Sequence, residues 1–146
     1  MKLAKGNMWL HSCNTFLFTA NNVVNQGKLV MGAGAAKQAK ELYPTAPALL
    51  GAKILTRRNP QGFYGLAFCQ QYNCRLGAFQ TKYHWNNDSD VELIKASIRQ
   101  LELHAVSMPS QVFFLNFPGI GLGGLKREEV LPLLTTLPDN VTIWER

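Results

Sequence analysis

The chain has 146 residues, of which 47% are hydrophobic and 16% are charged, so we expect one domain, residues 1–146, with a buried core. These proportions exclude a disordered tail, and no segment approaches the roughly 20 apolar residues of a membrane span, so we expect a soluble, cytoplasmic protein. The net charge of +6 favours an anionic partner, either a nucleic acid or a phosphorylated metabolite. Three cysteines without a C-x-x-C pair, and three scattered histidines, argue against a zinc site or a disulfide framework.

The first half of the chain alternates between strand and helix patterns. Residues 2–9 are expected to form a short strand or turn, and residues 15–20 are a continuous apolar run of the kind that parallel sheets bury. A helix from Gly32 to Leu42 should end before Pro44, because a residue that precedes proline avoids the helical region. A second, shorter helix is expected from Pro47 to about Lys53.

The next segment predicts a hairpin followed by the clearest helix of the chain. Residues 63–70 and 75–81 have the pattern of two paired strands. Ser89, with Glu92 three residues later, forms a capping-box pattern at the start of an amphipathic helix. Apolar residues recur on one face of that helix at intervals of three and four: Val91, Ile94, Ile98, Leu101 and Ala105. This spacing indicates a helix that covers a sheet.

The last third adds two strands and a helix. Residues 111–117 are expected to be a central strand, residues 127–136 a helix strained by Pro132, and residues 140–144 a final strand. The alternation of strands and helices along the whole chain predicts an α/β protein, a three-layer α/β/α fold with a mixed central sheet.

Two glycine-rich loops, residues 31–36 and 119–124, each follow an apolar strand. The first N–H groups of a helix lack partners within it, so a glycine loop that opens a helix can bind a phosphate. Two such loops can lie at the same edge of the sheet, outside the carboxyl ends of the strands, with a pyrophosphate between them. The alternative is that they are independent structural turns.

Other candidate functional residues lie next to the loops. Asn21, Asn22 and Asn25 can contact sugar hydroxyls or can cap local turns. Lys82 ends a strand and precedes the aromatic residues 83–85, so it could be partly desolvated, and a desolvated amine is a nucleophile. A solvated lysine at the end of a strand is the commoner alternative.

In combination, these segments resemble a macrodomain, the ADP-ribose-binding α/β module. Residues 30–36, VMGAGAA, resemble the start of the first macrodomain helix, and residues 117–125, FPGIGLGGL, resemble the second, diphosphate-binding loop. Residues 79–85, FQTKYHW, are similar to the F-x-T-K-x-x-W segment of the DarG branch, antitoxins that remove ADP-ribose from thymidine in DNA.

The resemblance implies an ADP-ribosyl hydrolase that needs no cofactor or metal and uses Lys82 as its catalytic nucleophile. ADP-ribose would place its adenine near Asn7, its pyrophosphate between the two loops and its distal ribose near Asn22 or Asn25. The implied ligand-binding residues are Asn7, Asn21, Asn22, Asn25, Met31, Gly32, Gly34, Ala35, Gly119, Ile120, Gly121, Leu122 and Gly123.

The sequence also departs from the family pattern. Asn7 stands where macrodomains usually have an acidic residue after a glycine. The loop between Asn25 and Val30 is also a residue longer than in DarG, so Asn22 and Asn25 are exchangeable candidates for contact with the distal ribose. Gly123 occupies the region where terminal ADP-ribose hydrolases carry a catalytic aspartate, which leaves the lysine route. Two other functions stay open: a module that binds ADP-ribose or a related nucleotide without turnover, and a basic single-strand-binding protein.

Overall fold

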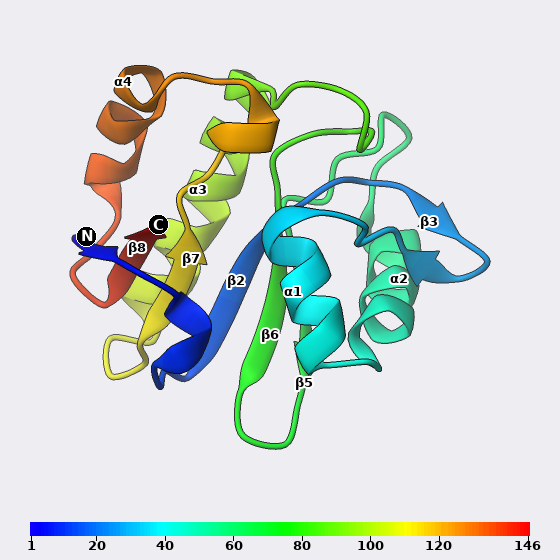
Figure 1. Cartoon of the computed structure of the whole chain (residues 1–146), viewed down its shortest axis with the longest axis horizontal. Helices are drawn as coiled ribbons and strands as arrows, with labels where there is room; N and C mark the ends of the chain where they lie inside the picture. The colour runs from blue at the N-terminus through cyan, green and yellow to red at the C-terminus, as the bar shows by residue number, and fades with distance from the viewer.

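The computed structural model describes residues 1–146, and a six-stranded sheet runs through it between two layers of helices (Figure 1). The strand order is β1-β8-β7-β2-β6-β5, and every neighbouring pair is parallel except β5 with β6. A separate two-stranded hairpin joins β3 to β4. The strands are β1 (Lys2–Lys5), β2 (Thr15–Ala20), β3 (Val24–Asn25), β4 (Lys28–Leu29), β5 (Leu66–Gln70), β6 (Arg75–Gln80), β7 (Phe113–Asn116) and β8 (Val141–Glu145).

Helices α1 and α2 pack on one face of the sheet, and α3 and α4 pack on the other (Figure 1). None of the helices combines the length and the apolar composition that a membrane crossing requires. The helical segments are η1 (Met8–Leu10), α1 (Gly34–Leu42), α2 (Ala46–Arg57), α3 (Val91–Ser107), η2 (Gly121–Gly123), α4 (Arg127–Val130) and η3 (Leu131–Thr136).

The position of strand β2 in the sheet explains why its sequence is mostly apolar. Phe16 and Phe18 enter the core beneath α1 and α2, whereas Leu17 enters the core beneath α3. Because a strand between two helical layers is buried on both faces, its residues need no polar alternation. The prediction of a three-layer α/β/α fold with a mixed sheet is confirmed.

Most predicted elements are present, with shifted ends. Helix α1 begins at Gly34 rather than Gly32, and α2 continues to Arg57, four residues beyond the expected end at Lys53. Strand β5 begins at Leu66 rather than Phe63, because the N–H groups of Tyr64 and Gly65 and the carbonyl of Gly62 bond to the side chain of Gln80. The predicted helix over residues 127–136 is one turn of α-helix followed by the 3-10 helix η3. Pro132 accounts for the change, because it has no N–H for an α-helical bond.

The predicted capping box at Ser89 is wrong. Helix α3 starts at Val91, and its N-cap is Asp90, whose carboxylate accepts from the Leu93 N–H at 3.1 Å. Ser89 instead donates its backbone N–H to the carbonyl of Gly123 at 2.7 Å. Its position is therefore set by a contact with the second glycine loop and not by the helix.

Candidate functional site

A cavity of about 740 Å³ opens at the carboxyl ends of β2, β6 and β7. Strands β6 and β7 lie on either side of β2, and their connections run over opposite faces of the sheet. In such sheets the carboxyl ends diverge at this point and leave a crevice. The cavity is lined by residues 19–21, 30, 32–36, 81–82, 85–89, 116, 119–120 and 122–123.

The first glycine loop presents the uncapped N-terminus of α1 to the cavity. Ala33 is the N-cap residue and makes no side-chain hydrogen bond to the helix, so the first N–H groups of α1 lack a side-chain partner. Gly34 has a φ of +57°, a left-handed conformation that favours glycine. This arrangement of free donors and a helix dipole suits a phosphate group.

The second glycine loop faces the first across the cavity. Leu122, which is 73% exposed, approaches to 3.6 Å from the position that a Cβ of Gly34 would take. On its other side this loop packs against residues 88–89: a Cβ on Gly123 would lie 2.4 Å from the Ser89 Oγ. Glycine at position 123 therefore permits a loop-to-loop contact as well as an open cavity wall.

Thr19 and Asn116 join the ends of β2 and β7 inside the cavity. The Asn116 Oδ1 accepts from the Thr19 N–H at 3.0 Å, and its Nδ2 donates to the Thr19 hydroxyl at 3.0 Å. The regular pairing of the two strands ends at Leu17 and Leu115, so the asparagine side chain extends it by one step. Both residues line the cavity.

Lys82 lines the cavity immediately after β6, half-buried, and its ammonium group makes no hydrogen bond or ion pair. The backbone around it is bonded to the end of β2 and the residues that follow it: Thr81 N–H donates to the Ala20 carbonyl, and Asn22 N–H donates to the Tyr83 carbonyl at 3.1 Å. Asp88 is the one carboxylate that lines the same cavity. The site thus contains one amine and one carboxylate, both free to act on a bound molecule.

Buried Gln80 positions the segment that carries Lys82. Its Oε1 accepts from the N–H groups of Tyr64 and Gly65, at 2.9 and 3.1 Å, and its Nε2 donates to Gly62 at 2.9 Å. Its own carbonyl accepts from the Ser97 hydroxyl of α3 at 2.8 Å. These bonds attach the end of β6 to the loop at 62–65 and to the helix behind it.

The aromatic residues after Lys82 lie at the cavity rim. Trp85 lines the cavity and is 55% exposed, and the His84 ring packs on it with centroids 4.8 Å apart. The Nδ1 of His84 accepts from the Asn86 N–H, and His84 itself does not line the cavity. His84 therefore supports the rim.

The structure brings together most of the ligand-binding residues expected from the sequence. Lys82 shares the cavity wall with eight of them: Asn21, Gly32, Gly34, Ala35, Gly119, Ile120, Leu122 and Gly123. Asn21 is buried, accepting from the Val23 N–H at 2.7 Å and donating to the Val30 carbonyl at 3.1 Å. Its side chain thus holds the first loop in place.

Five expected residues lie outside the lining of this cavity. Met31 is buried in the core, and Gly121 is exposed and does not line the cavity. Asn22 accepts from the Arg58 guanidinium through its carbonyl and its Oδ1, at 3.0 and 3.2 Å. Asn25 is exposed in the β3–β4 hairpin.

The fifth, Asn7, lines a second cavity of about 30 Å³ together with Trp9 and Trp144. The two cavities share Ala35 and Asn116. The Asn7 Oδ1 caps η1 by accepting from the Trp9 N–H at 3.1 Å, which leaves its Nδ2 without a partner. The small cavity thus adjoins the larger one and has two tryptophans in its lining.

Solved structures similar to the chain identify the fold as that of a macrodomain. The similar structures include Thermosipho africanus DarTG in complex with ADP-ribose, with a TM-score of 0.81 and 21% identity over 99% of this chain and 42% of that one. The macrodomain of Thermus aquaticus DarG matches with a TM-score of 0.77 and 21% identity, over 99% of this chain and 95% of its own. The macrodomain of Mycobacterium tuberculosis DarG has a TM-score of 0.73 and 23% identity, over 98% and 96%.

Two further comparisons give no match. No model of a known protein family matches the chain, and no curated protein matches it significantly. The chain spans less than half of the DarTG chain but nearly all of the two isolated DarG macrodomains. The shared feature is the macrodomain fold itself, over the whole chain.

Several residues of the cavity were missed by the sequence analysis: Thr19, Trp85, Asp88, Ser89 and Asn116. Asn116 had a signal, since a polar residue directly after three apolar strand residues stands at a carboxyl end of the sheet. Asp88 and Ser89 had none, because their position depends on a contact with residues 123–124, more than thirty positions away.

Proposed function

We propose that the protein is an ADP-ribosyl hydrolase that holds ADP-ribose between its two glycine loops and removes it from an acceptor by means of Lys82. The observation that carries this proposal is that Lys82, the N-terminus of α1 and the second loop line one cavity. The ADP-ribose complex of the DarTG protein, which has the same fold, supports the choice of ligand. Because DarG macrodomains are among the similar structures, thymidine in DNA is the acceptor we propose.

The ligand would lie across the carboxyl ends of the strands. The pyrophosphate would lie between α1 and the second loop, where the first N–H groups of α1 have no side-chain cap. The adenine would extend past Ala35 toward Asn7 and the small aromatic cavity. The distal ribose would lie at the Lys82 end, with Asn22 as the nearer of the two candidate asparagines because its N–H bonds to Tyr83.

In the proposed reaction the neutral Lys82 amine attacks the anomeric carbon of the distal ribose. A carbon–nitrogen bond forms to Nζ, the bond to the acceptor breaks, and the acceptor leaves with the electron pair and takes up a proton. Water then adds to the same carbon, the bond to Nζ breaks, and free ADP-ribose and the amine are restored. No redox step or cofactor is required.

Asp88 is the group we propose to move protons in this reaction. It is the only carboxylate of the cavity, and it enters from the loop that carries Lys82. A carboxylate can accept a proton from the lysine ammonium or from the attacking water. This carboxylate would come from residue 88, because position 123, in the region where terminal ADP-ribose hydrolases carry a catalytic aspartate, is a glycine in this chain.

A second candidate function is an ADP-ribose-binding module without turnover. The observation in its favour is that the Lys82 ammonium has no hydrogen-bond partner, so its charge is free to pair with a ligand phosphate. Replacement of the lysine distinguishes the two functions, because a charge partner affects binding and a nucleophile affects release.

The test is calorimetric titration of ADP-ribose into the wild type, Lys82→Ala and Lys82→Arg, followed by incubation of each with single-stranded DNA ADP-ribosylated on thymidine. We expect all three to bind ADP-ribose and only the wild type to release it from DNA. Lys95→Ala, at a lysine on α3 outside the cavity, should behave as wild type. Binding without release by the wild type, where a known hydrolase succeeds, would favour the binding module. Absence of binding would refute the proposed site.

A further inference from the structure

The charges of the chain are unevenly distributed. Residues 1–87 contain ten lysines and arginines and one acidic residue, Glu41, whereas residues 88–146 contain five basic and eight acidic residues. The first segment forms α1, α2 and the β3–β4 hairpin, on one face of the sheet, and the second forms α3 and α4 on the other (Figure 1). The sequence asymmetry therefore becomes a difference between the two faces of the molecule.

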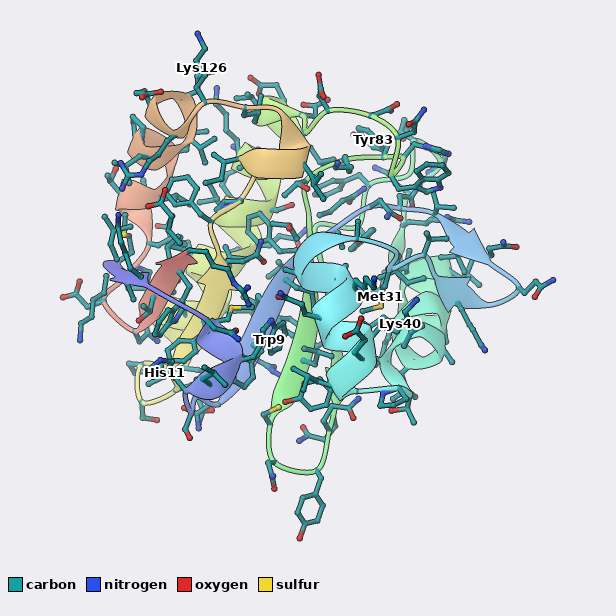
Figure 2. The ribbon with its side chains drawn as sticks, viewed as in Figure 1. Trp9, His11, Met31, Lys40, Tyr83 and Lys126 are labelled. Atoms are coloured by element: carbon teal, nitrogen blue, oxygen red, sulfur yellow. The ribbon has the colours of Figure 1, made fainter.

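The basic face is formed by α1, α2 and the β3–β4 hairpin, which we call the α1–α2 face. It carries six cations, Lys28, Lys37, Lys40, Lys53, Arg57 and Arg58, of which all but Arg58 are exposed. Lys40 projects from α1 in Figure 2. None of the six forms an ion pair, whereas on the opposite face Lys95 pairs with Glu92 and Arg127 with Glu145. The one carboxylate of this face is Glu41 on α1, so the face keeps a net positive charge.

This face is continuous with the rim of the cavity through Arg58. Its guanidinium bonds to Asn22, and the Asn22 N–H bonds to Tyr83, next to Lys82. Tyr83 and Trp85 are 37% and 55% exposed, and Tyr83 lies at the end of the molecule where the strands have their carboxyl ends (Figure 2). Two exposed aromatic residues thus follow Lys82 at the cavity rim, and one of them, Tyr83, is connected through Asn22 to Arg58 of the basic face.

We propose that the α1–α2 face binds the backbone of a single-stranded nucleic acid, with bases stacking on Tyr83 and Trp85. Cations that follow a phosphate backbone and aromatic side chains that stack on bases are the two elements of single-strand binding. An acidic peptide would use the cations and leave the rings without a function. The inference rests on the proposed function, since the bound strand would carry the ADP-ribosylated base into the Lys82 cavity.

The chain offers a matched pair of variants. Lys53 and Arg57 lie one turn apart on α2, and Lys95 and Arg99 have the same residue types and spacing on α3. The double variant Lys53→Glu/Arg57→Glu and its control Lys95→Glu/Arg99→Glu therefore change the net charge equally on opposite faces. Neither pair lines the cavity.

The measurement is fluorescence anisotropy of an unmodified, labelled oligothymidine over a range of salt concentrations. We expect the α2 pair to weaken binding by about tenfold or more and to lower the salt slope by about 1.4, because each lost phosphate contact on a single strand removes about 0.7 from the slope. The α3 pair should weaken binding by less than about threefold. Lys37→Glu/Lys40→Glu, on α1, should act as the α2 pair does and replaces it if that variant does not fold.

Equal losses from the α2 and α3 pairs would overturn the inference, because they would show a response to net charge alone. Competition by polyglutamate as strong as that by unlabelled oligothymidine would also overturn it, in favour of an acidic peptide. ADP-ribose titration of each variant separates this result from the proposed function. If the protein binds the strand on this face but neither binds nor releases ADP-ribose, the inference about this surface is supported and the proposed hydrolase function is refuted.

Discussion

The carboxylate of Asp88 occupies the space that a side chain at position 124 would need. A Cβ on Gly124 would lie 2.7 Å from the Asp88 Oδ1, and Gly124 has a φ of +77°. The second glycine loop therefore accommodates a carboxylate from another loop as well as the proposed ligand. The end of this loop and the loop after β6 must pack together for Asp88 to reach the cavity wall.

Replacing Gly124 by alanine should displace Asp88. We expect Gly124→Ala to lower the rate of ADP-ribose release and to destabilise the fold by about 1–2 kcal/mol, the cost of a left-handed residue with a side chain. Gly121→Ala is the control, because Gly121 has a φ of +65° but no atom within 4 Å of its Cβ position. Denaturation should show a similar strain for both, and single-turnover release should be slowed more by Gly124→Ala. Equal rates in the two variants would contradict a role for the Asp88 position.

Asp88→Asn tests the carboxylate without moving the loop. If Asp88 transfers protons, kcat should fall by about 10²-fold or more, the contribution of a general base, while the Kd of ADP-ribose changes little. Glu92→Gln removes an exposed carboxylate four residues away, outside the cavity, and should leave kcat unchanged. Loss of binding rather than of kcat would assign Asp88 to ligand contact instead.

The bond between Asn116 and Thr19 should support both stability and ligand binding. Asn116→Leu leaves the Thr19 N–H without its acceptor beside the cavity, so we expect a loss of about 1–3 kcal/mol in the free energy of unfolding. Because the ends of β2 and β7 then separate, ADP-ribose should also bind more weakly. Thr19→Ser keeps the hydroxyl that accepts from Asn116 and should be nearly neutral in urea denaturation and in calorimetry.

The sequence was sufficient for those parts of the fold that depend on local patterns. The apolar run of β2, the spacing of α3 and the two glycine loops are read from neighbouring residues, and they place the cavity at the carboxyl ends of the strands. Local patterns failed at Ser89, where a contact with Gly123 overrides a good capping sequence. Asp88 enters the cavity through the same kind of distant contact, so it could not be predicted.

Gln80 illustrates a residue whose importance is visible only in three dimensions. It is fully buried, and its side chain makes three bonds to the backbone of residues 62–65. Gln80→Leu would leave two N–H donors and a carbonyl unpaired, so we expect a loss of about 3 kcal/mol or more in the free energy of unfolding. Gln70→Leu is the control, because Gln70 is an exposed glutamine on the paired strand β5. Equal midpoints in urea for the two variants would contradict this role.

His104 should make the stability of the protein depend on pH. Burial lowers its pKa from the usual value of about 6.5, and the positive charges of Arg75 and Arg57 lower it further. Its ring lies against Phe68 of β5, with centroids 5.0 Å apart, so protonation places a charge at an aromatic contact. The unfolded chain therefore binds a proton at this histidine more readily than the folded chain does.

It follows that the contribution of neutral His104 to the free energy of unfolding is complete above about pH 6.5. This contribution decreases as the pH falls from there toward the lower pKa of the folded state. The glutamine of His104→Gln cannot titrate. The free energy of unfolding of the wild type should therefore decrease relative to that of the variant as the pH falls through this window. Urea denaturation of both proteins at successive pH values measures that difference. Arg57→Gln removes one of the two repelling charges and should raise the lower end of this window, so that the window becomes narrower. A difference that stays constant between neutral and acidic pH would show that His104 has the same pKa in both states.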